Sequence, residues 1–129
     1  MRHKKESSSL KDWTEKAERD LKRVRARIKE GDIEDAAFHL QQAVEKYLKA
    51  FLLSKGWRLK KIHDLEALLD EAVKYAPQLE RFRQLCEMVT GYYLLQRYPF
   101  FAEEPAKKEI EKCLKEAQAL VEALVENID

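Results

Sequence analysis

Apolar residues recur at helical spacing along five segments of the chain. In the first, they step by four, four, three and four residues, which places them on one face of a helix over about 10–30. The second segment, about 33–55, has a wider apolar face, which favours a central helix that touches several neighbours. Gly31 and Asp32 separate the two segments as a helix stop and an N-cap. The apolar stripe of the first helix consists of Trp13, Ala17, Leu21, Val24 and Ile28.

Three further amphipathic segments follow. The pattern predicts a short helix over about 63–75, a longer one over about 78–96 and a final one over about 103–128. Pro77 separates the first two, and Pro99 disfavours helical backbone at the residue before it. The sequence therefore predicts an all-α fold, an antiparallel up-and-down bundle of four long helices and one short helix.

Composition agrees with a single helical domain. The chain has 129 residues, only 3 Gly and 3 Pro, and 38% charged beside 45% hydrophobic residues. Residues 1–9 are basic and then serine-rich without apolar periodicity, so we predict a disordered tail there and one domain over residues 10–129. The longest uncharged stretch is too short to span a membrane, and Cys86 and Cys113 lack metal-binding spacing. We expect a cytoplasmic protein with no metal site, no cofactor and no membrane association.

Charge is distributed unevenly between the two ends. Residues 1–30 carry 11 Lys and Arg against 6 Asp and Glu, whereas residues 102–129 carry 4 against 8. This split could steer an anionic partner towards the first helix. It could equally reflect two helices that pack side by side with complementary surfaces.

Polar side chains border the apolar stripes of the first two predicted helices. Gln42, Glu45 and Lys49 share one face of the second helix, and Asp20 borders the stripe of the first. If these edges meet, the four residues form one polar network. Such a network is either a satisfied structural cluster or a polar pocket.

His63 and Asp64 stand at the start of the short helix. Asp64 complements the helix dipole there, and His63 is either a plain N-terminal residue or part of a site. The sequence contains no Gly-rich phosphate loop, no GxSxG and no HExxH, so the usual catalytic signatures are missing.

Arg97 and Tyr98 lie at the break before Pro99. A guanidinium among tyrosines suits phosphate or base recognition, although it could also stack on its own tyrosines while the proline turns the chain. Phe100 and Phe101 follow directly and offer apolar area that a partner subunit could cover.

Four segments in this order resemble the HEPN domain family: WTEKAERDL at residues 13–21, AAFHLQQAVEKYLKAFLLSKG at 36–56, HDL at 63–65 and RYP at 97–99. The resemblance implies a helical bundle that usually forms homodimers and has been proposed to bind nucleotides. It also implies an association with a minimal nucleotidyltransferase, as in prokaryotic toxin–antitoxin pairs.

The chain departs from the ribonuclease members of this family. Those members share a motif in which an Arg is followed four to six residues later by a His. No His follows Arg97 at that spacing. Our leading hypothesis is a non-catalytic or weakly catalytic homodimer that binds a nucleotide or a nucleotidyltransferase partner through Arg97, Tyr98, His63 and Asp64. One alternative is a metal-independent ribonuclease toxin that uses Arg97 and His63 on RNA. Another is a purely structural dimeric adaptor.

Overall fold

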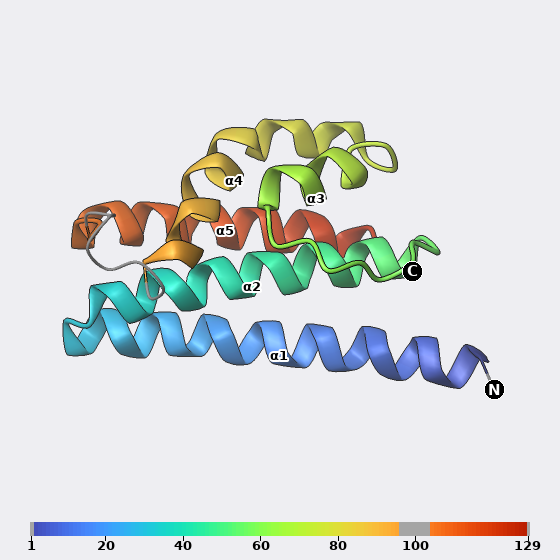
Figure 1. Cartoon of the computed structure of the whole chain (residues 1–129), viewed down its shortest axis with the longest axis horizontal. Helices are drawn as coiled ribbons and strands as arrows, with labels where there is room; N and C mark the ends of the chain where they lie inside the picture. The colour runs from blue at the N-terminus through green and yellow to red at the C-terminus, as the bar shows by residue number, and fades with distance from the viewer. Residues whose placement is uncertain (1, 96–103, 129) are drawn as a thin grey trace.

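The computed structural model describes the backbone of residues 2–95 and 104–128 and the side chains of residues 10–95 and 104–128. Over these residues the chain forms five α-helices and two 3₁₀ helices, with no strand (Figure 1). The predicted all-α bundle is confirmed. The elements in chain order are α1 (Arg2–Glu30), α2 (Ile33–Ser54), α3 (Leu65–Ala72), η1 (Pro77–Phe82), α4 (Arg83–Thr90), η2 (Gly91–Leu94) and α5 (Lys107–Glu126).

Helix α2 is the centre of the bundle. It runs antiparallel to α1 on one side and contacts α3, α4 and α5 on the others (Figure 1). The wide apolar face of its sequence is thereby buried against several neighbours, as predicted. The largest fully buried side chains of the core are Phe51, Leu40, Leu48, Leu52, Leu65, Leu68, Leu69, Leu79, Ile110, Leu120, Leu124 and Gln41.

The turn between α1 and α2 follows the local chemistry of its two residues. Gly31 has a φ of 81°, a left-handed conformation that glycine adopts without steric cost. The side chain of Asp32 accepts a hydrogen bond from the backbone N–H of Asp35 at 3.2 Å and caps α2. Helix α1, however, begins at Arg2 and not near residue 10, so the helical backbone extends beyond the apolar stripe.

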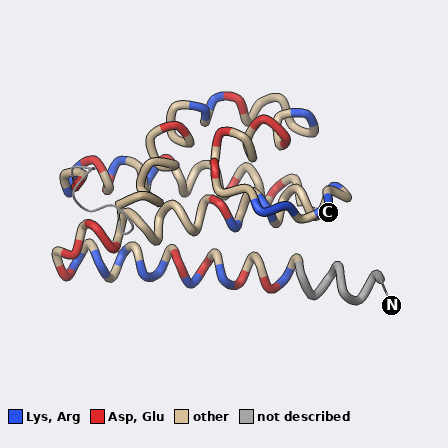
Figure 2. The backbone as a smooth tube through the Cα atoms, in the orientation of Figure 1, with Lys and Arg blue, Asp and Glu red and all other residues tan. Residues whose placement is uncertain are grey.

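Charged residues of both signs alternate along the described part of α1 (Figure 2). Two of its charged side chains pair with α2: Arg27 Nε lies 2.7 Å from Asp35 Oδ2, and Asp20 pairs with Lys46. Helix α1 therefore forms ion pairs with both an acidic and a basic residue of α2.

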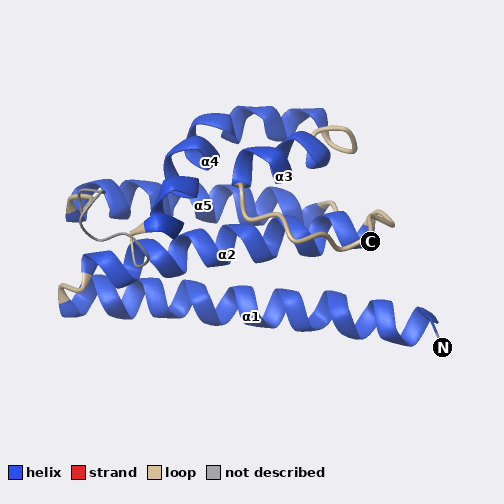
Figure 3. Cartoon of the chain, in the orientation of Figure 1, coloured by secondary structure: helices blue, strands red, loops and turns tan. Residues whose placement is uncertain are grey.

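The second half of the fold is more broken than the sequence pattern predicts (Figure 3). The expected helix over 78–96 is divided into η1, α4 and η2. Pro77 occupies the first turn of η1, where its missing N–H costs nothing, and the chain closes tight 3₁₀ turns on both sides of α4. Helix α3 is correspondingly short, and α5 begins at Lys107.

Both cysteines are free thiols buried in the core. Burial raises the pKa of the Cys86 thiol to about 12. Within the described residues, no helix is long and apolar enough to cross a membrane.

Candidate functional site

Helix α2 buries three polar side chains that follow one another at one-turn intervals. Gln41, Glu45 and Lys49 stand four residues apart and so lie on one face. Gln41 Nε2 donates to Glu45 Oε1 at 3.0 Å, and Lys49 Nζ lies 3.0 Å from Glu45 Oε2. The side chains of Glu45 and Lys49 are only 6% and 4% exposed, so this ion pair is almost fully removed from water.

His63 joins these residues from the connection between α2 and α3. Its Nδ1 lies 3.2 Å from both carboxylate oxygens of Glu45, and its backbone carbonyl accepts a hydrogen bond from Gln41 Nε2 at 3.3 Å. Its ring stacks on Tyr93 of η2, with centroids 5.3 Å apart and planes 9° from parallel. We call Gln41, Glu45, Lys49 and His63 the Glu45 cluster.

The local structure around His63 fixes its position. Asp64 is the N-cap of α3 and accepts a hydrogen bond from the backbone N–H of Glu66 at 2.9 Å. The backbone N–H of Leu65, the first residue of α3, donates to Thr90 Oγ1 at the end of α4. His63 is therefore held between α2, α3 and η2 although its side chain remains 51% exposed.

Both carboxylate oxygens of Glu45 are engaged by protein donors. A carboxylate offers about four lone-pair sites, and Gln41, Lys49 and His63 together occupy both of its oxygens. Because a carboxylate only accepts hydrogen bonds, the contact with Nδ1 makes that nitrogen the donor, and in a neutral ring Nε2 is then the acceptor. Glu45 thus orients both the buried Lys49 and the half-exposed ring of His63.

A cavity of about 480 Å³ opens beside the cluster. Three of its lining residues are lysines, Lys49, Lys60 and Lys61, against the single carboxylate of Glu45. The basic stretch of the α2–α3 connection, visible in Figure 2, contributes two of these lysines. The lining therefore carries an excess of positive charge, which favours an anion over a cation. The cavity is lined by Trp13, Glu45, Lys49, Leu59, Lys60, Lys61 and His63.

Asp20 lies in a separate polar cluster between α1 and α2. It is 2% exposed, and its Oδ1 lies 2.9 Å from His39 Nδ1 and 3.5 Å from an Arg23 guanidinium nitrogen. Its Oδ2 accepts a hydrogen bond from Lys46 Nζ. We call Asp20, Arg23, His39 and Lys46 the Asp20 cluster.

The structure thus brings together only part of the predicted polar network. Glu45 and Lys49 are in direct contact, and Gln42 joins them through Gln41, to whose Oε1 its Nε2 donates at 2.7 Å. Asp20 stands apart. Gln42 is the predicted member of the shared face, but the buried residue is Gln41. The spacing of four residues between Gln41 and Glu45 is the sequence signal for this contact.

The predicted ligand residues divide in the same way. His63 lies in the Glu45 cluster, and Asp64 is engaged in capping α3. Arg97 and Tyr98, with Phe100 and Phe101, lie outside the described residues.

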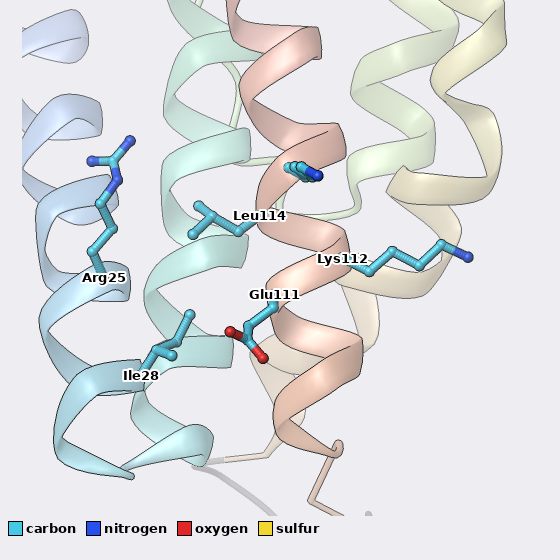
Figure 4. Close-up of a pocket in the computed structure, with 6 residues that line it drawn as sticks. Arg25, Ile28, Glu111, Lys112 and Leu114 are labelled. Carbon is cyan, nitrogen blue, oxygen red and sulfur yellow. The ribbon is translucent and has the colours of Figure 1, made fainter.

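A groove of about 730 Å³ lies between α1 and α5 (Figure 4). Arg25 and Ile28 reach into it from α1, and Glu111 and Leu114 from α5. No predicted site residue lines this groove. Size alone therefore does not make it the functional site.

A third polar contact ties η2 to α5. The Tyr92 hydroxyl donates to Glu109 Oε2 at 2.6 Å, and burial followed by this hydrogen bond raises the pKa of Tyr92 well above its ordinary value. Among the residues whose side chains are described, no group of three His, Cys, Asp or Glu is arranged to hold a metal ion. The Glu45 cluster and its cavity therefore carry the polar chemistry we assign to a site.

Comparison with known proteins agrees with the helical arrangement. The family model of the HEPN domain matches residues 10–128, almost the whole chain. The chain belongs to the HEPN family.

Three proteins are similar to this HEPN protein in sequence, and two of them are solved structures with a similar fold. It is 26% identical over 127 residues to "Putative toxin MJ1304" of Methanocaldococcus jannaschii, a match that covers 87% of this chain and 83% of the relative. The crystal structure of ST0689, an archaeal HEPN homologue, superposes with a TM-score of 0.73 at 26% identity, covering 93% and 98% of the two chains. The crystal structure of TT1696 from Thermus thermophilus gives a TM-score of 0.76 at 27% identity, covering 92% and 97%.

Proposed function

We propose that this HEPN protein is a homodimer that binds a nucleotide, and that it pairs with a minimal nucleotidyltransferase in a toxin–antitoxin-type system. The toxin-like relative supports the biological setting. The observation that carries the binding function is the cationic cavity beside His63, where three lysines face one fully engaged carboxylate.

Electrostatics favour a phosphate-bearing ligand at this position. Lys49 is held in place by Glu45, and His63 is held by the same carboxylate and by the stack on Tyr93. Preorganised donors of this kind bind an anion without first losing side-chain freedom. Arg97 and Tyr98, which follow Tyr93 closely in the sequence, complete the set of proposed ligand contacts.

Titration calorimetry with ATP tests this proposal, with His63→Ala and Arg97→Ala beside the wild-type protein. We expect each substitution to weaken binding about tenfold, the effect of losing one hydrogen bond to a charged group. Arg58→Ala is the matched control, because Arg58 lies in the same connection and does not line the cavity. Equal losses in all three variants, or no heat of binding in the wild type, would contradict specific nucleotide binding.

The partner proposals have their own measurements. Light scattering after gel filtration should give twice the chain mass of 15.3 kDa for a homodimer. Mixing with a minimal nucleotidyltransferase should shift the elution to a larger complex. A monomer that elutes unchanged beside the nucleotidyltransferase would refute both.

A second candidate function is metal-independent RNA cleavage, favoured by the contact between His63 and Glu45. With Nδ1 donating to the carboxylate, Nε2 is the nitrogen able to take a proton from an attacking 2′-hydroxyl. The oxygen would then attack phosphorus, the 5′-oxygen would leave and take up a proton, and the product would end in a cyclic phosphate. Arg97 would stabilise the charge on the phosphate.

Incubation of RNA with the protein in EDTA separates the two functions. Cleavage that survives EDTA and disappears in both His63→Ala and Arg97→Ala would support the ribonuclease. Intact RNA with all three proteins folded would exclude it and leave the binding function.

A further inference from the structure

The cavity beside His63 has an apolar wall as well as its cations. Trp13 of α1 is half-buried and lines it together with Leu59, whose side chain is 52% exposed at the rim. An anion-binding site alone needs neither residue. Their presence indicates that the occupant has a flat apolar part.

The positions of the lysines divide the cavity into two ends. Lys49 Nζ lies 5.5 Å from the centroid of the Trp13 ring, so the buried cation and the aromatic wall are adjacent. Lys60 and Lys61 belong to the exposed connection that forms the outer wall. The inner end therefore combines an aromatic surface with one cation, and the outer end presents two cations towards solvent.

The charges of the lining favour a ligand that accepts hydrogen bonds. Glu45 is the acidic residue lining the cavity, and its oxygens are already occupied by Gln41, Lys49 and His63. The three lysines of the lining, Lys49, Lys60 and Lys61, carry positive charge and donate hydrogen bonds. A volume of about 480 Å³ lies within the range of small-molecule sites, roughly 300–1,000 Å³.

We infer that this cavity takes one nucleotide unit, with its base against Trp13 and Leu59 and its phosphate on Lys60 and Lys61. The inference rests on the proposed nucleotide binding and adds to it a base-recognising surface formed by Trp13 and Leu59. The same unit occurs as a free mononucleotide and as one residue of a single-stranded RNA. Aromatic stacking accepts either, because every base has a π-face.

Tryptophan fluorescence reports on this subsite directly. The chain has two tryptophans, and Trp57 does not line the cavity, so Trp57→Phe leaves Trp13 as the emitter. We expect AMP to quench this variant saturably, and adenosine and inorganic phosphate each to bind at least about tenfold more weakly than AMP. A short single-stranded RNA, titrated in parallel, shows whether a nucleotide within a strand reaches the same subsite.

Substitutions at the two ends of the cavity test the assignment of base and phosphate. Trp13→Leu removes the stacking surface and should weaken AMP binding, measured by calorimetry, about tenfold or more. Lys60→Ala combined with Lys61→Ala should weaken AMP binding and inorganic phosphate binding by similar factors, while Arg58→Ala leaves both unchanged.

A third variant keeps the test decisive if Trp13→Leu fails to fold. Leu59→Glu places a carboxylate at the exposed rim and should abolish AMP binding without loss of structure. Val125→Glu makes the same change of charge at a side chain of similar exposure, 48%, on α5 and should leave binding unchanged.

The outcomes separate this inference from the proposed function. AMP or RNA binding that depends on His63 but is unaffected by Trp13→Leu and Leu59→Glu would overturn the base subsite and leave nucleotide binding intact. Absence of any nucleotide binding in the wild type would overturn both. An equal effect of Arg58→Ala and the double lysine variant would show general charge attraction and would also overturn the subsite.

Discussion

The buried ion pair of α2 makes a strong prediction about stability. Replacing Glu45 with Gln keeps the shape and one carbonyl acceptor but leaves the Lys49 ammonium, 4% exposed, without a counter-charge. Removing one partner of a buried pair costs about 3–5 kcal/mol because the other charge stays buried. The neighbouring cavity gives Lys49 some access to water, so we expect the lower end, about 3 kcal/mol.

Urea denaturation followed by circular dichroism measures this loss. With an m-value of about 2 kcal/mol/M, 3 kcal/mol lowers the midpoint by about 1.5 M. The double variant Glu45→Gln with Lys49→Met removes the stranded charge and should recover most of the midpoint, so the two substitutions are strongly non-additive.

The chain supplies a matched pair for comparison. Lys11 and Glu15 are also four residues apart on a helix, but they are 78% and 48% exposed and 3.9 Å apart. Glu15→Gln should leave the midpoint almost unchanged, because exposed pairs contribute little. If Glu45→Gln shifts the midpoint no more than Glu15→Gln, or if the double variant is as unstable as the single one, the reasoning is refuted.

Three further predictions concern the core, a turn and a thiol. Phe51→Ala should cost about 3–5 kcal/mol in a denaturation experiment, whereas Val125→Ala at an exposed position should cost far less. Gly56→Ala, at a φ of 87°, should destabilise by about 1 kcal/mol, while Gly91→Ala, at a φ of −66° with nothing within 4 Å of the added carbon, should not. Burial raises the pKa of the Cys86 thiol from about 9 to about 12. The contribution of this thiol to stability is therefore complete below pH 9 and is lost as the pH rises towards 12. Cys86→Ala should flatten this part of a stability–pH curve, and an unchanged curve would contradict the prediction.

The helices that local chemistry defines were predictable, and those that packing defines were not. Helix α2 ends one residue from the prediction because Gly31, Asp32 and Gly56 mark its limits in the sequence. The region around α4 has the periodicity of one helix, but packing against α3 and α5 accommodates tight turns on both sides. Periodicity shows which face is buried and does not distinguish a continuous helix from a segmented one.

The candidate site was predictable only where its residues share a helix. Glu45 and Lys49 are one turn apart, and their spacing already indicates contact. The approach of His63 to Glu45 spans 18 residues and depends on the connection that folds back along α2. The cavity is a product of the same path, since Leu59, Lys60 and Lys61 reach Trp13 only because of it.

The Asp20 cluster has a consequence for how α1 and α2 align. Two smooth apolar faces could slide past each other by one turn and still bury similar area. A slide of one turn, about 5.4 Å, would carry the buried Asp20 carboxylate away from its α2 partners His39 and Lys46 and leave it only Arg23 of its own helix. We infer that the buried Asp20 carboxylate fixes the register of α1 against α2. In the observed register it contacts both of its α2 partners, and a shift of one turn would lose both contacts.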